Sequence, residues 1–115
     1  MAFNIVSSGI YLPRHPWQAD KLDQFLNLPE GTVNTKYGVS QKYVADNHET
    51  AMSMAGKAAQ ECLANANLII SDVDLVIYAS GTHHQSLPYD AAGLLAFLNA
   101  PHYIESFDIN STCLS

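Results

Sequence analysis

The spacing of apolar residues along the chain predicts three helices. In residues 19–27 and 47–66, apolar side chains recur every three or four positions, which places them on one face of a helix. A third helix is predicted over residues 89–99, with Pro88 suited to its first turn and Pro101 to its end. The apolar face of residues 47–66 is mostly alanine, so we expect another element to pack closely against it.

Three other segments are predicted to be strands. Residues 3–12 alternate loosely between apolar and polar positions, and residues 106–110 form a short mixed run. Residues 75–79, Leu-Val-Ile-Tyr-Ala, form a continuous apolar run, which is typical of a strand covered on both faces. We expect residues 32–44 to be an irregular surface segment. The order strand-helix-strand-helix-strand predicts a layered α/β fold with parallel strands and right-handed crossovers.

The composition fits one small folded domain with few charges. The chain has 115 residues, of which 48% are hydrophobic and 14% charged, against a usual charged share of about 25%. So few charges predict more apolar surface than a chain of this size buries by itself. Eleven acidic and five basic residues give a net charge of −6, which argues against a nucleic-acid partner. No apolar run reaches the roughly 18 residues of a membrane helix, so we expect a cytoplasmic protein without a membrane partner.

The two cysteines, Cys62 and Cys113, are too few for a disulfide framework and are not spaced as a CxxC motif. Cys62 lies on the apolar face of the helix predicted over residues 47–66, so we expect it to have a structural role. Two thiols with unrelated roles are therefore the better interpretation.

Cys113 is the candidate for chemistry because it directly follows a predicted strand and has small polar neighbours. This position would point it at the carboxyl edge of the sheet, where α/β proteins bind ligands. A helix starting near Thr112 would favour the thiolate, which attacks thioesters well and suits acyl transfer. The alternative from local chemistry alone is a small buried residue in a tight turn.

The pair His83-His84 invites a metal-binding interpretation, which we do not favour. Adjacent residues of a strand point to opposite faces, and no carboxylate or thiol lies nearby at helical ligand spacing. We therefore expect no metal site, and a loop or dimer-contact role for the pair.

The segment that ends at Cys113 resembles the nucleophile motif of a known family. Ser106-Phe107-Asp108-Ile109-Asn110-Ser111-Thr112-Cys113 is similar to that motif in the β-ketoacyl-acyl-carrier-protein synthase III family of thiolase-like condensing enzymes. Further segments match the family in the same order: Gly9-Ile10-Tyr11-Leu12-Pro13, Thr35-Lys36-Tyr37-Gly38-Val39, Glu49-Thr50, Asp74-Leu75-Val76-Ile77-Tyr78-Ala79-Ser80-Gly81-Thr82 and Leu87-Pro88.

The resemblance implies a thiolase-like fold, with residues 1–115 as an incomplete N-terminal part of its layered α/β/α domain. It implies that Cys113 takes an acyl group from acyl-coenzyme A. The acyl-enzyme would then condense with malonyl-acyl-carrier protein, losing carbon dioxide and giving a 3-ketoacyl product for fatty acid biosynthesis. The expected partners are the acyl-carrier protein, an acyl thioester such as acyl-coenzyme A, and a second copy in a homodimer. No permanently bound cofactor is expected.

The family completes its site with a His and an Asn from the later half of its chains, beyond the position of Ser115. The histidines present here do not match that His. We therefore expect residues 1–115 alone to show no malonyl decarboxylation. A non-catalytic fragment or subunit that contributes only a dimer face is the alternative from a different functional class.

Two residues depart from the family pattern. Thr32 and Lys36 occupy the positions where the family often has a Trp and an Arg that hold the adenine and phosphate of coenzyme A. Lys36 offers a phosphate only a point charge, and Thr32 offers no aromatic face. An acyl-carrier protein or an atypical donor, as in a thiolase-superfamily acyltransferase of secondary metabolism, is therefore the alternative. Lys36 as an ordinary solvated lysine is the other interpretation.

Leu87 matches the position from which the family inserts a side chain, often Phe, into the acyl pocket of the partner subunit. The smaller Leu would leave room for a longer or branched acyl chain.

Overall fold

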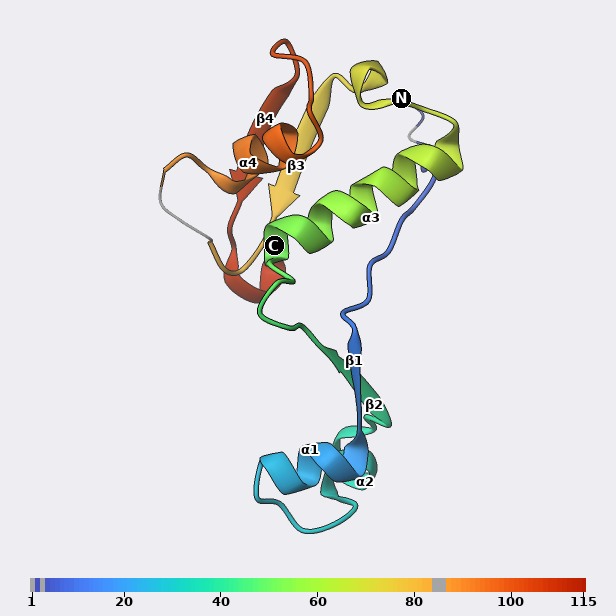
Figure 1. Cartoon of the computed structure of the whole chain (residues 1–115), viewed down its shortest axis with the longest axis vertical. Helices are drawn as coiled ribbons and strands as arrows, with labels where there is room; N and C mark the ends of the chain where they lie inside the picture. The colour runs from blue at the N-terminus through green and yellow to red at the C-terminus, as the bar shows by residue number, and fades with distance from the viewer. Residues whose placement is uncertain (1, 3, 84–86) are drawn as a thin grey trace. The chain divides into compact units, whose positions relative to one another are not determined.

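The computed structural model describes residues 2, 4–83 and 87–115. The chain divides into two compact units, Met1–Tyr11 with Ala51–Ser115, and Leu12–Thr50 (Figure 1). Each unit has its own two-stranded sheet and its own helices. Within the described residues, no helix is long and apolar enough to cross a membrane.

The first unit is built on two parallel strands, β3 (Leu75–Ala79) and β4 (Glu105–Ile109), which pair from Leu75 opposite Glu105 to Ala79 opposite Ile109. Helix α4 (Asp90–Phe97) lies between them in sequence and packs against both. The predicted parallel α/β pairing is confirmed.

One face of this sheet is half-buried and the other is exposed. Val76, Tyr78, Ser106 and Asp108 alternate with exposed neighbours along the two strands. Asp108 binds the first turn of α4, so the half-buried face is the one that α4 covers. The described residues thus cover one face of residues 75–79, and the exposed face is apolar, with Leu75 and Ile77; its expected coverage stays a prediction.

Helix α3 (Ala51–Ala66) packs on α4 through the small residues that the sequence predicted. Gly56 is buried where a Cβ atom would run into the ring of Phe97. The helix begins four residues later than predicted, at Ala51 instead of residue 47. The reason is that Asp46 closes a turn by accepting the backbone N–H of His48 and, through its carbonyl, that of Glu49.

Residues 4–11 lie along α3 without forming a strand, so the strand predicted over residues 3–12 is wrong. Several of their polar groups pair with α3 instead. The Ile10 N–H donates to Glu61 Oε2 at 2.8 Å, and the Ser7 hydroxyl donates to the Cys62 carbonyl at 2.8 Å. No described strand pairs with this segment.

The second unit contains β1 (His15–Gln18), α1 (Ala19–Phe25), α2 (Thr32–Tyr37) and β2 (Gln41–Val44), with β1 and β2 antiparallel. Residues 32–44 were expected to be irregular, and this expectation is wrong. The sequence pattern that would indicate these strands is weak, because β2 is short and polar and its partner strand, β1, begins with His15-Pro16.

A buried carboxylate holds α1 to α2 in this unit. Asp23 is 2% exposed, and its two oxygens accept the N–H groups of Gly31 and Val33, each at 2.8 Å. The free N–H groups at the start of a helix need such acceptors, so Asp23 determines where α2 begins.

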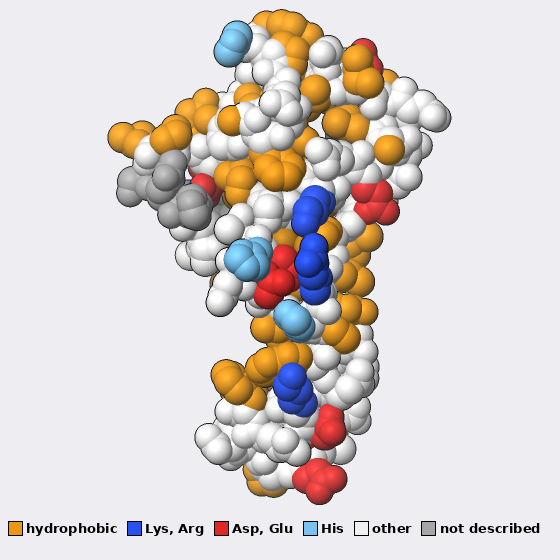
Figure 2. All heavy atoms as spheres, in the orientation of Figure 1, with side chains coloured by type: hydrophobic (Ala, Val, Ile, Leu, Met, Phe, Trp, Pro, Cys, Tyr) orange, Lys and Arg blue, Asp and Glu red, His pale blue; other side chains and the backbone are white. Residues whose placement is uncertain are grey.

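Large apolar side chains remain on the surface (Figure 2), as the low charge content predicted. Several are at least 65% exposed: Ile5, Val6, Ile10, Phe25, Ile69, Leu87 and Leu114.

The contact between Gly56 and Phe97 gives a test of the α3–α4 packing. We expect Gly56→Ala to lower the free energy of unfolding by about 1–3 kcal/mol, because overpacking outweighs the better helix propensity of alanine. Gly93→Ala is the matched control, since its new methyl would meet only the flexible end of Met52. Urea denaturation followed by circular dichroism measures the free energy of unfolding of both variants. A Gly56→Ala protein as stable as the Gly93→Ala protein would contradict the close packing. We also expect Phe97→Leu, which removes the ring, to restore the stability of the Gly56→Ala protein.

Candidate functional site at the carboxyl edge of the parallel strands

Cys113 lies where the sequence placed it, just beyond the carboxyl end of β4. It is an exposed free thiol in the short 3-10 helix η2 (Thr112–Leu114). Its sulfur is 3.9 Å from the Thr112 hydroxyl oxygen. A helix does begin at Thr112, but it has only three residues.

The loop after β3 lies against the loop that carries Cys113. The Ser80 N–H donates to the Ile109 carbonyl at 3.1 Å, which extends the β3–β4 pairing by one step. Beyond it, a Cβ atom on Gly81 would lie 3.0 Å from the Thr112 carbonyl oxygen. A larger residue at position 81 would therefore push the two loops apart.

Thr112 has a strained backbone. Its φ of 54° lies in the left-handed region, which is unfavourable for a β-branched residue by about 1–3 kcal/mol. Such a conformation persists only where neighbouring groups hold it. The residue before the thiol is therefore held by its surroundings.

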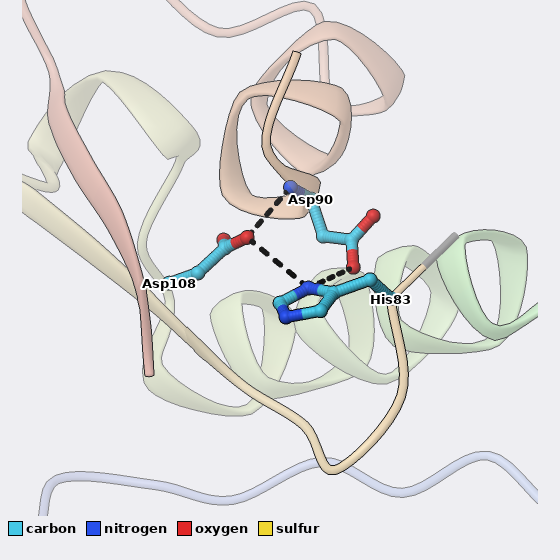
Figure 3. A group of neighbouring side chains, drawn as sticks. All are labelled: His83, Asp90 and Asp108. Atoms are coloured by element: carbon cyan, nitrogen blue, oxygen red, sulfur yellow. Dashed lines mark hydrogen bonds and ion pairs between the residues drawn. The ribbon is translucent and has the colours of Figure 1, made fainter. Parts of the chain in front are cut away.

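Three ionisable side chains meet beside this loop (Figure 3). His83 Nδ1 lies 3.5 Å from Asp90 Oδ2 and 3.9 Å from Asp108 Oδ2. His83 comes from the loop after β3, Asp90 from the first residue of α4, and Asp108 from β4. The Asp90 side chain is 2% exposed, whereas that of His83 is 46% exposed. The cluster thus joins three elements at one edge of the sheet.

Asp108 also fixes the start of α4. Its Oδ2 accepts the Asp90 N–H at 2.9 Å and its Oδ1 accepts the Ala91 N–H at 2.7 Å. Burial, together with the negative charges of Asp90 and Asp108, raises the pKa of the Tyr78 phenol above its usual value of 10.0. The Tyr78 phenol is therefore harder to ionise than that of an exposed tyrosine.

Asn110 connects the cluster to the Cys113 loop. Its side-chain nitrogen lies 2.7 Å from His83 Nε2, and its side-chain oxygen accepts the Thr112 N–H at 3.2 Å. A continuous series of contacts thus runs from the two carboxylates to the residue that precedes the thiol.

Sequence reasoning missed this cluster. Near His83 it found no carboxylate at ligand spacing, because Asp90 and Asp108 come close only through the β3–α4–β4 arrangement. One ligand atom from each of the three residues lies within 4.8 Å of the others, a donor set that could hold a metal ion. Both Asp108 oxygens, however, already accept backbone N–H groups. His84, the other half of the predicted pair, falls outside the described residues.

Thr32 and Lys36 lie one helical turn apart on α2 in the second unit. The Thr32 hydroxyl donates to the Pro29 carbonyl at 2.6 Å, so it is used within its own turn. Lys36 is exposed, with its Nζ 5.6 Å from the centre of the Tyr37 ring. Their role with an acyl donor stays a prediction.

Leu87 lies before α4 in sequence and is 83% exposed. No described side chain buries it, and its predicted role in an acyl pocket or dimer contact stays a prediction.

The chain is similar in sequence to known proteins. No family model matches it. It is 33% identical to β-ketoacyl-[acyl-carrier-protein] synthase III of Rickettsia akari over 98% of this chain and 35% of that protein. The synthase III of Bartonella tribocorum is also 33% identical, over 91% of this chain and 32% of that protein. The chain resembles the N-terminal portion of synthase III. It spans about a third of the length of these curated relatives.

Solved structures give the same result for the fold. The 3-oxoacyl-[acyl-carrier-protein] synthase III of Aquifex aeolicus matches with a TM-score of 0.85 and 30% identity, over 92% of this chain and 34% of that one. OleA of Xanthomonas campestris matches with a TM-score of 0.81 and 18% identity, over 92% of this chain and 33% of that one, which shows the fold alone. The thiolase-like fold predicted for this chain is confirmed.

The Asp108 carboxylate can be tested apart from any activity. We expect Asp108→Ala to lower the free energy of unfolding by about 1–3 kcal/mol, because two N–H groups at the start of α4 lose their acceptor. Asp74→Ala, which removes an exposed carboxylate in front of β3, is the control and should change it by less than about 0.5 kcal/mol. Equal urea midpoints for the two variants would show that Asp108 does not anchor α4.

Proposed function

We propose that Cys113 accepts an acyl group from a thioester, as the first step of a β-ketoacyl synthase III-type condensation. The observation that carries this proposal is the exposed Cys113 thiol at the carboxyl edge of two parallel strands, in a chain whose fold and sequence match synthase III. Cys62, by contrast, is half-buried against residues 4–11, with its sulfur 3.2 Å from the Ser7 hydroxyl. The greater exposure of its thiol favours Cys113 over Cys62 as the proposed nucleophile.

In the proposed first step, the sulfur of Cys113 attacks the carbonyl carbon of the acyl thioester. A new carbon–sulfur bond forms to Cys113, the bond to the donor sulfur breaks, and the thiol proton ends on the released donor thiol. The product is itself a thioester and stays reactive, which is why a cysteine suits this step better than a serine.

The second step is the condensation itself. Carbon 2 of a malonyl group on an acyl-carrier protein loses carbon dioxide and bonds to the acyl carbonyl, and the Cys113 thiolate leaves. We propose the acyl-carrier protein as the partner for this step and a second copy of the protein as the partner in a homodimer. The relatives that match this chain are acyl-carrier-protein synthases, which supports this choice of partner.

The donor in the first step is proposed to be either acyl-coenzyme A or an acyl-carrier protein. Lys36 is exposed and can pair with a phosphate as a point charge, but the Thr32 hydroxyl is engaged within its own turn. Both donors present a phosphopantetheine thioester, so the chemistry at Cys113 is the same for both. Leu87, in this proposal, faces the acyl chain in the dimer and allows a longer or branched chain than Phe would.

Protection from alkylation tests the proposal. We expect pre-incubation with acetyl-coenzyme A, followed by removal of the excess, to protect Cys113 from iodoacetamide, because acylation removes the thiol. Cys62 in the same sample should be modified at an unchanged rate, and hydroxylamine, which cleaves thioesters, should restore Cys113. Peptide mass spectrometry measures both cysteines at once.

Free coenzyme A is the matched control, since it offers the same nucleotide without an acyl group. If neither acetyl-coenzyme A nor an acyl-carrier-protein thioester protects Cys113, the proposed nucleophile is wrong. A non-catalytic chain that contributes a dimer face would then be the better interpretation.

A further inference from the structure

His83 has contacts that acyl transfer at Cys113 does not by itself explain. It lies between the carboxylates of Asp90 and Asp108 on one side of its ring and the amide of Asn110 on the other. The residue is exposed on a loop, yet both of its ring nitrogens have partners. This arrangement restricts the ring more than a solvent-facing histidine requires.

The carboxylates determine which ring nitrogen of His83 carries the proton. The carboxylate oxygens of Asp90 and Asp108 accept hydrogen bonds, and each residue places one of them near Nδ1. The proton of a neutral ring is therefore assigned to Nδ1, although the distances of 3.5 and 3.9 Å make this an electrostatic preference and not a short hydrogen bond. Nε2 is then left as an acceptor.

The His83 tautomer in turn orients Asn110. Because Nε2 is an acceptor, the group 2.7 Å away must be the Asn110 NH₂, which donates to it. The Asn110 carbonyl oxygen then faces the Thr112 N–H, which donates to it at 3.2 Å. The opposite amide orientation would place two donors against each other at Thr112. One arrangement satisfies every group in the series.

We propose that His83 is a positioning residue, which holds the strained Thr112 backbone through Asn110 and so orients the Cys113 thiol for acyl transfer. This inference rests on the proposed function of Cys113. Asp90 and Asp108 select the tautomer, and Gly81 lets the His83 loop approach Thr112 closely enough for the contact. His83 itself does not touch the reacting atoms in this account.

The test compares two reactions of the same thiol in the whole protein. Acylation by acetyl-coenzyme A needs an oriented sulfur, whereas alkylation by the small reagent iodoacetamide does not. We expect His83→Leu to slow acylation of Cys113 by about 10- to 100-fold and to leave its alkylation rate within about twofold. His83→Gln, whose side-chain oxygen can replace Nε2 as the acceptor for Asn110, should restore most of the acylation rate. His102→Leu, at another exposed histidine of the same unit, is the control and should change neither rate.

A double-mutant cycle with Asn110→Ala tests the series of contacts. Because His83 is proposed to act through Asn110, the double variant should be no slower than the slower single variant. Additive losses would overturn the proposal, as would normal acylation in His83→Leu. If His83→Leu does not fold, as judged by circular dichroism, His83→Gln and Asn110→Ala still decide the outcome. A wild-type protein that is alkylated but never acylated would instead overturn the function proposed for Cys113, and this inference with it.

Discussion

The pairing of β3 with β4 is the constraint on which the rest of the first unit depends. Because the strands are parallel and in register, their carboxyl ends coincide, and the loops that follow must share one edge. Asp108 then fixes the start of α4 to this edge by accepting two N–H groups. The thiol, the His83 cluster and the approach of Gly81 to Thr112 all follow from that arrangement.

The sequence alone predicted the elements whose signal is local. The apolar run of β3 was predicted at its observed bounds, and α4 and β4 were predicted within two residues at each end. The strand prediction for residues 4–11 failed because strand formation depends on a neighbouring strand. Here several polar groups of the segment pair with α3 instead. The second unit was missed in part, since a short antiparallel pair with a polar strand leaves little periodicity.

The candidate site shows the same division. The position of Cys113 just after a strand could be predicted from the sequence, and its role as nucleophile stays a prediction. The contact of His83 with Asp90 and Asp108 could not be predicted, because it arises from three segments that only the fold brings together. Similarly, the position of Thr32 and Lys36 on one helix could not be predicted from a segment expected to be irregular. The matched relatives are about three times as long as this chain. Their complete activity is therefore a proposal for this chain and does not follow from the similarity.

The central claim is that Cys113 becomes a thioester. The most direct measurement is peptide mass spectrometry of the protein after incubation with an acyl thioester, with the spectra recorded before and after hydroxylamine. We predict one acyl group on the peptide that contains Cys113, which hydroxylamine removes, and none on the peptide that contains Cys62. An unmodified Cys113, or acyl groups distributed equally over both cysteines, would contradict it.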